Sequence, residues 1–185
     1  MKIVGISGSL RVDSKNTSLL KAIAKQLEKF ENVDFEIVSI DLPLFDGNHS
    51  KENIPESVSK IREQVKNADG LVITCPEYNW NITTALKNAI DWLSLGGINS
   101  PLRRHVVAIA GVGGGRLGSV RSQMTVRQTL LHDQVWVIPG PEVLIAPTDD
   151  LFDKNGDLTD PVATSLLDEL LSQLVKAAPL LRESK

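Results

Sequence analysis

The chain has 185 residues, a length typical of one domain with a full hydrophobic core. Its 20 basic and 23 acidic residues give a net charge of -3, so no electrostatic feature favours nucleic acid or an anionic membrane as a partner. No apolar run reaches the roughly 18 residues that span a bilayer, and a lone cysteine excludes an intrachain disulfide. A strand pattern begins at once, without room for a signal peptide, so we expect one soluble, cytoplasmic domain over residues 1–185.

Apolar runs and amphipathic stretches alternate along the chain. In chain order they predict the strand Lys2–Ser7, the helix Thr17–Phe30, the strand Asp34–Ile40, the helix Pro55–Asn67, the strand Gly70–Cys75, the helix Thr84–Leu93, the strand Val106–Ala110, the helix Ser119–Leu131, the strand Val135–Ile138 and the helix Thr164–Leu181. This alternation predicts an α/β fold with a doubly wound parallel sheet between two helical layers, a three-layer α/β/α arrangement. Five strands fit the flavodoxin-like order 2-1-3-4-5 better than the six-stranded Rossmann order.

The loop after the first strand is rich in hydroxyl groups and leads into a helix, whose N-terminal N–H groups and dipole attract an anion. Arg11 can give a paired, charge-assisted contact to phosphate oxygens. Further donors are available from the side chains of Ser9, Ser14, Asn16 and Thr17. The loop lacks the G-x-x-x-x-G-K-[ST] pattern of a P-loop. Two interpretations remain, a site for a terminal phosphate monoester and a simple N-cap cluster.

The loop after the third strand, Thr74-Cys75-Pro76-Glu77-Tyr78-Asn79-Trp80, is the most informative stretch. Pro76 resists continuation of either strand or helix, so the chain turns out of the sheet. The chain has only four Phe, three Trp and one Tyr, yet Tyr78 and Trp80 both fall here. Because ligands of α/β proteins bind past the carboxyl ends of strands, this loop predicts the edge of a site for a flat, hydrogen-bonding ring. Glu77 is either a ring contact or a solvated loop acid.

The loop after the fourth strand contains a literal G-x-G-x-x-G from Gly113 to Gly118. A dinucleotide fingerprint belongs after the first strand and needs an acidic residue at the end of the next one, and this loop meets neither condition. We therefore favour a loop whose backbone approaches a ligand ring closely at Gly113 and Gly114. A true dinucleotide site and a merely flexible turn are the alternatives.

Together these loops resemble those of the NAD(P)H-dependent FMN reductases of the flavodoxin-like fold, the group that includes bacterial quinone and chromate reductases. The resemblance spans Lys2 to about Asp160 and rests on Gly8-Ser9-Leu10-Arg11, Pro76-Glu77-Tyr78-Asn79 and Leu86-Lys87-Asn88-Ala89-Ile90-Asp91-Trp92. It implies bound FMN, with the phosphate at Ser9, Arg11, Ser14, Asn16 and Thr17 and the ring against Pro76, Glu77, Tyr78, Asn79, Gly113 and Gly114.

The same resemblance implies NADPH or NADH as co-substrate and a two-electron ping-pong hydride transfer to a small-molecule electron acceptor, such as a quinone or free flavin. No side-chain catalyst is implied. It also implies a homodimer or a homotetramer. Arg121 and Glu142 stand where tetrameric relatives have an interface network, whereas the tyrosine places of that network hold Trp80 and Met124. The alternative is a flavodoxin-type electron carrier, although a net charge of -3 offers little of the acidic surface that such carriers use for docking.

The other reactive residue types are predicted to be structural. The histidines, His49, His105 and His132, lack metal-ligand spacing, so we expect no metal site and interpret them as surface or capping residues. Cys75 is predicted to be a buried thiol, and Trp92 to lie in the core or at a dimer interface. The Asp153–Asp157 stretch fails the register of a calcium loop and is interpreted as a turn.

Overall fold

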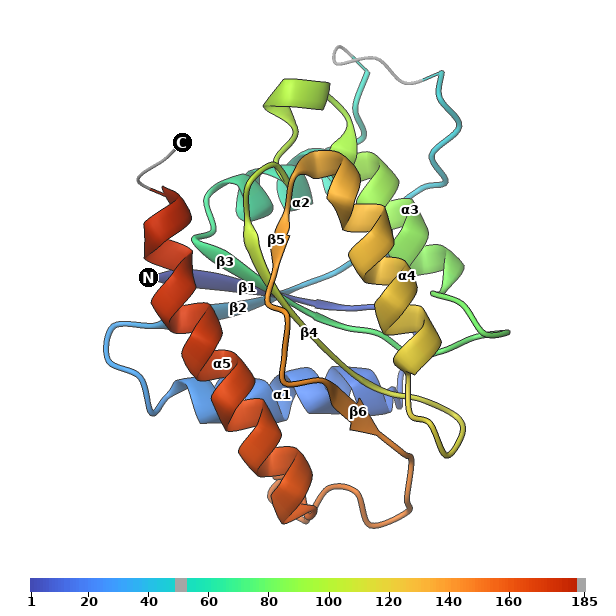
Figure 1. Cartoon of the computed structure of the whole chain (residues 1–185). Coiled ribbons are helices and arrows are strands. Elements are labelled where there is room, and N and C mark those ends of the chain that lie inside the picture. The colour runs from blue at the N-terminus through green and yellow to red at the C-terminus, as the bar shows by residue number, and fades with distance from the viewer. Residues whose placement is uncertain (49–52, 183–185) are drawn as a thin grey trace.

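The structure is a computed structural model of the chain and describes residues 1–48 and 53–182. Its helices and strands follow the predicted alternation (Figure 1). They are β1 (Lys2–Ser7), α1 (Lys15–Leu27), β2 (Asp34–Val38), α2 (Glu56–Lys66), β3 (Gly70–Thr74), α3 (Thr84–Ser94), β4 (Val106–Val112), α4 (Val120–Leu130), β5 (Trp136–Val137), β6 (Val143–Ile145) and α5 (Pro161–Arg182).

The parallel sheet has the predicted order β2-β1-β3-β4-β5, and helices cover both of its faces. Apolar side chains of α2, α3 and α4 form one core with the sheet. Those of α1 and α5 form the second core on the opposite face, and the two helices lie on the same side of the sheet in Figure 1. The fold class is therefore confirmed, and the central strands are apolar throughout because both of their faces are buried.

The expectation of five strands omitted β6. Both β5 and β6 pair with β4, the first at Val106 and Val107 and the second from Ala110 to Val112. Between them lies Pro139-Gly140-Pro141, whose two prolines have no N–H to donate to a ladder. The last strand position of the sheet is therefore divided into two short pieces, and the second piece extends the sheet edge next to the predicted site.

The strand register brings the ligand-binding loops together. Ser7 at the end of β1 pairs with Thr74 at the end of β3, and Thr74 pairs in turn with Ala110 of β4. Beyond the ladder, Gly8 N–H donates to the Thr74 carbonyl over 2.7 Å. The loops after β1, β3, β4 and β6 consequently leave the sheet side by side at its carboxyl edge, where α/β proteins bind ligands.

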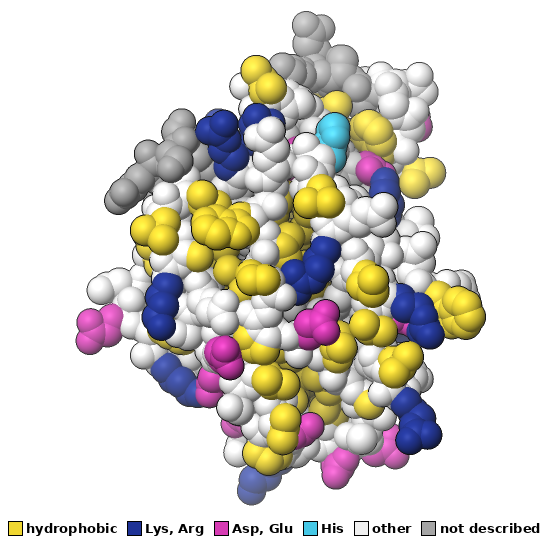
Figure 2. Space-filling model, viewed as in Figure 1, with side chains coloured by type: hydrophobic (Ala, Val, Ile, Leu, Met, Phe, Trp, Pro, Cys, Tyr) yellow, Lys and Arg dark blue, Asp and Glu magenta, His cyan; other side chains and the backbone are white. Residues whose placement is uncertain are grey.

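On the face of the molecule shown in Figure 2, no single sign of charge predominates. Basic and acidic side chains are interspersed on the face shown in Figure 2, in agreement with the small net charge of -3. None of the helices in residues 1–48 and 53–182 combines the length and apolar character needed to cross a membrane.

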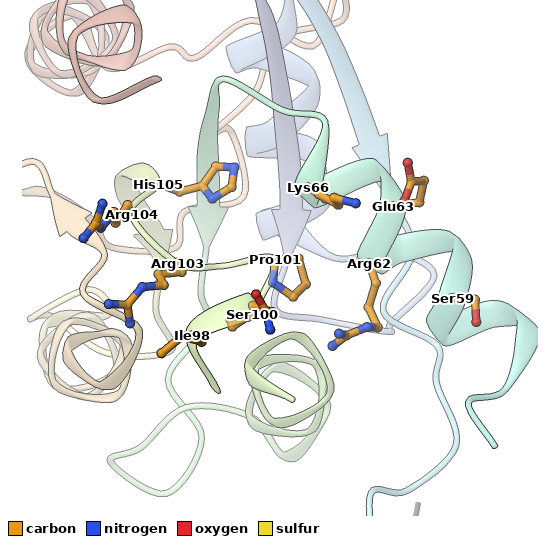
Figure 3. Close-up of a pocket in the computed structure, with 11 residues that line it drawn as sticks. Ser59, Arg62, Glu63, Lys66, Ile98, Ser100, Pro101, Arg103, Arg104 and His105 are labelled. Carbon is orange, nitrogen blue, oxygen red and sulfur yellow. The ribbon is translucent and has the colours of Figure 1, made fainter. Parts of the chain in front are cut away.

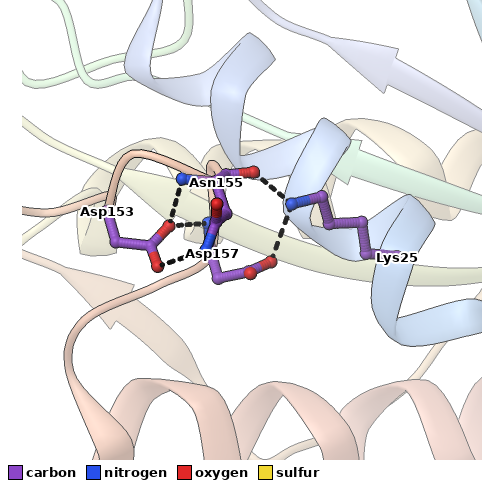
Figure 4. A network of polar contacts seen from close by, with 4 residues as sticks. All are labelled: Lys25, Asp153, Asn155 and Asp157. Atoms are coloured by element: carbon purple, nitrogen blue, oxygen red, sulfur yellow. Dashed lines mark hydrogen bonds and ion pairs between the residues drawn. The ribbon is translucent and has the colours of Figure 1, made fainter.

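The Asp153–Asp157 stretch is a turn, as predicted, and it contacts Lys25 of α1 (Figure 4). Asp153 Oδ1 accepts hydrogen bonds from the N–H groups of Asn155 and Asp157 over 2.8 and 2.9 Å. Lys25 of α1 donates to the Asn155 carbonyl and lies 3.0 Å from Asp157 Oδ1. The backbone hydrogen bond from Asp157, followed by that from Asn155, lowers the pKa of Asp153 below its ordinary value of 3.8.

This turn predicts a pH-dependent contribution to stability. A carboxylate whose pKa is lower in the folded state stabilises the protein above its unfolded-state pKa and loses that effect as the pH falls through the folded-state value. We therefore expect Asp153→Ala to lower the melting temperature at pH 7, and the difference from wild type to shrink below about pH 4. Asp149→Ala removes a nearby exposed carboxylate and serves as the control. A difference that stayed constant from pH 7 to pH 2 would contradict the assigned role of Asp153.

Candidate active site

Residues from the loops after β1, β3, β4 and β6 surround one cavity of about 260 Å³ at the carboxyl edge of the sheet. We call it the phosphate–ring cavity. The residues predicted for cofactor binding that line it are Ser9, Arg11, Ser14, Asn16, Pro76, Glu77, Tyr78, Gly113 and Gly114. Two further cavities, of about 380 and 620 Å³, also contain Ser9 and Arg11. The volumes of these two further cavities each lie in the range of about 300–1,000 Å³ that is usual for small-molecule sites.

The first loop forms the polar end of this cavity. Ser14 is the N-cap of α1, and its hydroxyl accepts from Thr17 N–H over 3.3 Å. The N–H groups of Lys15 and Asn16 precede the first intrahelical hydrogen bond and are oriented off the helix N-terminus. Arg11 is exposed beside them, and Asp13 is the one acidic side chain of the first loop that lines the cavity. The N-cap is therefore compatible with the predicted anion site, because the cap uses only the Thr17 N–H.

Two predicted phosphate contacts have other partners. The Asn16 side chain is buried and exchanges two hydrogen bonds with Val112, through Nδ2 to the carbonyl (2.9 Å) and from the N–H to Oδ1 (3.0 Å). It ties α1 to the end of β4, so the backbone N–H of Asn16 is the better anion donor. Thr17 lies outside the phosphate–ring cavity, with its hydroxyl 2.9 Å from that of Ser7.

The second loop is a tight hairpin. Tyr78 and Asn81 exchange backbone hydrogen bonds of 2.9 Å, and the two residues between them, Asn79 and Trp80, have φ values of 50° and 65°. Two consecutive positive φ values match a type I′ turn. Asparagine tolerates this conformation, but tryptophan is strained in it by about 1–2 kcal/mol. Asn79 does not line the phosphate–ring cavity, but it lines a neighbouring cavity together with Tyr78.

Glu77 is not a solvated loop acid, since its side chain is only 10% exposed. Its carboxylate accepts from the N–H of Arg121 over 2.9 Å and from Nη1 of the same residue over 2.8 Å. Arg121 is in the first turn of α4, where a negative charge is stabilised by the helix dipole. Its guanidinium carbon also lies 4.8 Å from the centre of the Trp80 ring, within the range of a cation–π contact. Arg121 thereby fixes the hairpin and offsets the strain at Trp80.

The glycines of the third loop have separate functions. A Cβ atom on Gly113 would lie 1.9 Å from the Gly118 carbonyl oxygen, so this position requires glycine for the loop to close on itself. Gly118 has a φ of 58° and approaches the backbone of Ile145 in β6. At Gly114, in contrast, an added Cβ would have no atom within 4 Å, and the residue is exposed beside the cavity. Close packing explains the spacing of Gly113 and Gly118 without a dinucleotide site.

Sequence reasoning missed four residues that line the cavity, Asp13, Lys15, Val112 and Pro147. Lys15 was detectable, since it lies in the first loop just before the predicted helix Thr17–Phe30, and its Nζ donates to the Thr148 carbonyl over 2.5 Å. Pro147 follows β6, a strand too short and too close to prolines to be recognised by its pattern. The pairing of Glu77 with Arg121 joins positions 44 residues apart, and nothing local in the sequence signals it.

Cys75 is a buried thiol, as predicted. Its sulfur lies 3.5 Å from the Ser122 hydroxyl oxygen. Burial raises the pKa of the Cys75 thiol to about 12. The thiolate is the reactive form, so the native protein holds Cys75 inert at neutral pH.

We expect Cys75 in the folded protein to react with a soluble disulfide reagent at less than about one-hundredth of its rate in denaturant. The native rate should also stay low between pH 7 and pH 9, where an exposed thiol with a pKa of about 8.5 becomes largely ionised. Stopped-flow absorbance with and without guanidinium measures both rates. Rapid native labelling that rises with pH would contradict the burial of this thiol.

A separate cavity of about 730 Å³ lies at the opposite edge of the sheet (Figure 3). Arg62 and Lys66 from α2 line it on one side, and Arg103 and Arg104 from the turn before β4 line it on the other. Arg62 donates to the carbonyls of Trp92 and Leu95 over 2.5 and 2.8 Å and so closes the C-terminus of α3, which gives it a structural function. This cavity is far from the loops that hold the predicted site residues.

The histidine prediction needs one correction in the same region. His105 is buried, not a surface residue, and its ring nitrogens lie 3.1 Å from the Ala68 carbonyl and 3.3 Å from the Leu102 carbonyl. It joins the end of α2 to the start of β4, a contact between residues distant in sequence. His132 is exposed as predicted, and His49 lies outside the described residues.

The polar end and the loop hairpin fit the two ends of FMN. Hydroxyl groups, an arginine and helix N–H groups suit a phosphate monoester. Pro76, Tyr78 and the open backbone at Gly114 form a border beside which a flat ring can lie. Among the described residues, no group of three or more His, Cys, Asp or Glu is arranged to hold a metal ion.

Comparisons with known proteins agree with this geometry. A family model described as NADPH-dependent FMN reductase matches residues 1–150. An NAD(P)H-dependent FMN reductase of Pseudomonas aeruginosa is 35% identical over 174 residues, which cover 94% of this chain and 93% of the relative. A quinone reductase of Escherichia coli is 32% identical over 191 aligned positions, covering 100% of this chain and 97% of the relative.

Among solved structures, a flavoenzyme NAD(P)H:(acceptor) oxidoreductase of Paracoccus denitrificans superposes with a TM-score of 0.87 at 26% identity, over 96% of this chain and 97% of the other. The matches extend over the sheet and over all the loops that line the phosphate–ring cavity. They also decide between the enzyme and the electron carrier, because these relatives are reductases that act with NAD(P)H. The chain belongs to the NADPH-dependent FMN reductase family and is thus an oxidoreductase that works with FMN and NAD(P)H.

Proposed function

We propose that this protein reduces quinones, free flavin or similar small acceptors with NADPH or NADH, using FMN bound in the phosphate–ring cavity. The observation that carries the assignment of the site is the convergence of nine of the eleven predicted cofactor residues on one cavity. They come from loops separated by up to about a hundred residues, and only the parallel register of β1, β3 and β4 brings them together.

The chain's own groups would bind and orient the cofactor. Arg11, Ser9, the Ser14 hydroxyl and the N–H groups of Lys15 and Asn16 would hold the phosphate. Pro76, Tyr78, Gly113 and Gly114 would border the ring, and the ion pair with Arg121 keeps the charge of Glu77 compensated there. When bound, FMN supplies the chemistry of accepting a hydride from the nicotinamide and passing two electrons to the acceptor. We assign no side chain a proton-transfer role.

The absorbance spectrum of the purified protein tests this proposal. We expect a yellow protein with flavin absorption near 370 and 450 nm, which releases FMN on denaturation, and steady oxidation of NADPH or NADH in the presence of menadione. A flavin-containing protein without that oxidation would instead be an electron carrier. A colourless protein that takes up NAD(P) but no FMN would support a dinucleotide site and refute the proposal.

We further propose that residues 1–185 act as one cytoplasmic domain that assembles as a homodimer. Two large apolar side chains near the start of α4, Trp80 and Met124, are 74% and 63% exposed, which favours burial against another chain. A homotetramer is the less supported assembly, because Arg121 is already paired with Glu77 and Glu142 is exposed on a different loop. Light scattering coupled to gel filtration tests the assembly, and a monomer at micromolar concentration would contradict it.

A further inference from the structure

The Leu-Lys-Asn-Ala-Ile-Asp-Trp segment of α3 has no function in the proposed FMN site. Two of its polar groups, on Asn88 and Trp92, are one helical turn apart and therefore lie on the same face of α3. Both contact the segment Leu42–Phe45, which follows β2 and has no helical or strand structure of its own. The contacts are long-range, since they join positions more than 40 residues apart.

The side chains of Asn88 and Trp92 form hydrogen bonds with the backbone N–H and carbonyl groups of this segment. Asn88 Oδ1 accepts from the Phe45 N–H over 2.8 Å, and its Nδ2 donates to the Pro43 carbonyl over 3.0 Å and to the Leu42 carbonyl over 3.4 Å. Trp92 Nε1 donates to the same Pro43 carbonyl over 2.7 Å. The Phe45 ring packs edge-on against the Trp92 ring, with centroids 5.0 Å apart, so the position of the segment is specified by both polar and aromatic contacts.

This position makes Leu44 and Phe45 one wall of a cavity of about 680 Å³, which we call the Leu44 cavity. The hairpin also lines this cavity, through Tyr78 and Asn79, as do residues of α3 and α4. Tyr78 also lines the phosphate–ring cavity, so the two spaces meet at this side chain. Leu44 is 71% exposed, which is unusual for a leucine whose backbone is held so firmly.

We propose that the Leu44 cavity receives the body of the organic electron acceptor, and that Asn88 and Trp92 are positioning residues that hold Leu44 and Phe45 as its apolar wall. This inference rests on the proposed function. The apolar and aromatic part of the lining is Leu44, Phe45, Ile82 and the ring of Tyr78, and the rest is polar, including the amide of Asn79, the hydroxyl of Thr84 and the Lys87–Asp91 ion pair. Such a mixed surface suits a flat molecule whose ring packs against the apolar wall and whose carbonyl oxygens accept hydrogen bonds, which is the chemistry of a quinone.

The test uses two variants and two acceptors. Leu44→Ala truncates the wall directly, and Asn88→Ala removes the contacts that position it. Menadione has to enter the cavity, whereas ferricyanide is a small inorganic ion that can accept electrons without an apolar binding wall. For Leu44→Ala we expect the KM for menadione to rise about three- to tenfold with kcat nearly unchanged, and the rate with ferricyanide to stay at the wild-type level. Asn88→Ala should likewise raise the KM for menadione and leave the rate with ferricyanide unchanged.

Val162→Ala is the matched control, because it truncates an aliphatic side chain that is 65% exposed at the start of α5, on the other face of the sheet. It should leave both acceptors unaffected. Asn88→Asp keeps the oxygen that accepts from Phe45 N–H and loses both amide donors, so its effect on the KM should be smaller than that of Asn88→Ala. If Asn88 had only a structural function, Asn88→Ala would lower the melting temperature, and the activity with menadione relative to that with ferricyanide would stay unchanged.

An active wild-type enzyme whose Leu44→Ala variant keeps the KM for menadione would overturn this inference and leave the proposed function intact. An unchanged KM together with a shift from dimer to monomer would also overturn it, because Leu44 would then belong to a subunit interface. Failure of the wild-type protein to bind FMN or to oxidise NAD(P)H would refute the proposed function itself. Since Leu44 is exposed, its truncation leaves folding intact and keeps the test decisive.

Discussion

Arg11→Ala is expected to weaken FMN binding by about 10- to 100-fold. A hydrogen bond to a charged group contributes about 1.5–3 kcal/mol, and each 1.4 kcal/mol corresponds to a tenfold change in the dissociation constant. Arg11 is exposed on the first loop, and its backbone N–H donates to Ser9 Oγ over 3.3 Å, a contact that the substitution leaves in place. Titration of the apoprotein with FMN, followed by quenching of flavin fluorescence, measures the effect.

The control for this prediction is Arg103→Ala, which removes the same charge at the opposite edge of the sheet. Both variants should melt at the wild-type temperature as apoproteins, because neither arginine side chain is part of the hydrophobic core. The loss of affinity in Arg11→Ala should shrink at high salt, since the contact is electrostatic and partly exposed. Equal FMN affinities of Arg11→Ala and Arg103→Ala would refute the phosphate assignment.

Much of the fold could be predicted because the central strands are short and apolar on both faces. The runs at the start of the chain, after residue 70 and after residue 106 became β1, β3 and β4 with nearly the predicted bounds. A parallel sheet with these strands can place its loops only at one carboxyl edge, so the sequence also predicted which loops meet. Neither conclusion needed any knowledge of side-chain contacts.

What could not be predicted depends on pairings between distant residues. Asn16 looked like a phosphate donor because of its neighbours, but its amide bonds to Val112, 96 positions away. Glu77 was predicted to be either a ring contact or a solvated acid, and neither interpretation included Arg121, which α4 brings to it. The strand β6 has three residues and follows two prolines, so its pairing with β4 is decided by the sheet and not by its own propensity. In each case the local sequence contains no information about the distant residue or strand that becomes the partner.

The tip of the hairpin illustrates the same limit. A tryptophan at a φ of 65° contradicts local preference, and a sequence pattern would place asparagine or glycine there. The conformation persists because Arg121 contacts the Trp80 ring and holds Glu77 at the base of the hairpin. Strain of this kind is typical of functional sites, where the surrounding structure determines the backbone more strongly than the residue itself does.

The glycine loop gives the second large prediction, because two adjacent glycines should respond to alanine in opposite ways. In Gly113→Ala the new methyl group would meet the Gly118 carbonyl oxygen at 1.9 Å and the Ser119 nitrogen at 2.7 Å. Both are backbone atoms, so the loop has to move. Overpacking of this kind costs about 1–3 kcal/mol, which for a chain of this size lowers the melting temperature by about 3–10 °C. We expect this loss in the apoprotein, measured by circular dichroism.

Gly114→Ala is the matched variant, since its added methyl group meets no protein atom within 4 Å. Its apoprotein should melt at or slightly above the wild-type temperature, because alanine restricts the unfolded chain more than glycine does. The methyl group would, however, enter the space assigned to the FMN ring, so the affinity for FMN should fall. We expect Gly113→Ala to destabilise the apoprotein, and Gly114→Ala to weaken FMN binding without destabilising it. This pair of results would separate the packing function of the loop from its ligand function. If Gly114→Ala bound FMN as tightly as the wild type, the ring could not lie against this backbone, and the border of the site would have to be drawn from Pro76 and Tyr78 alone.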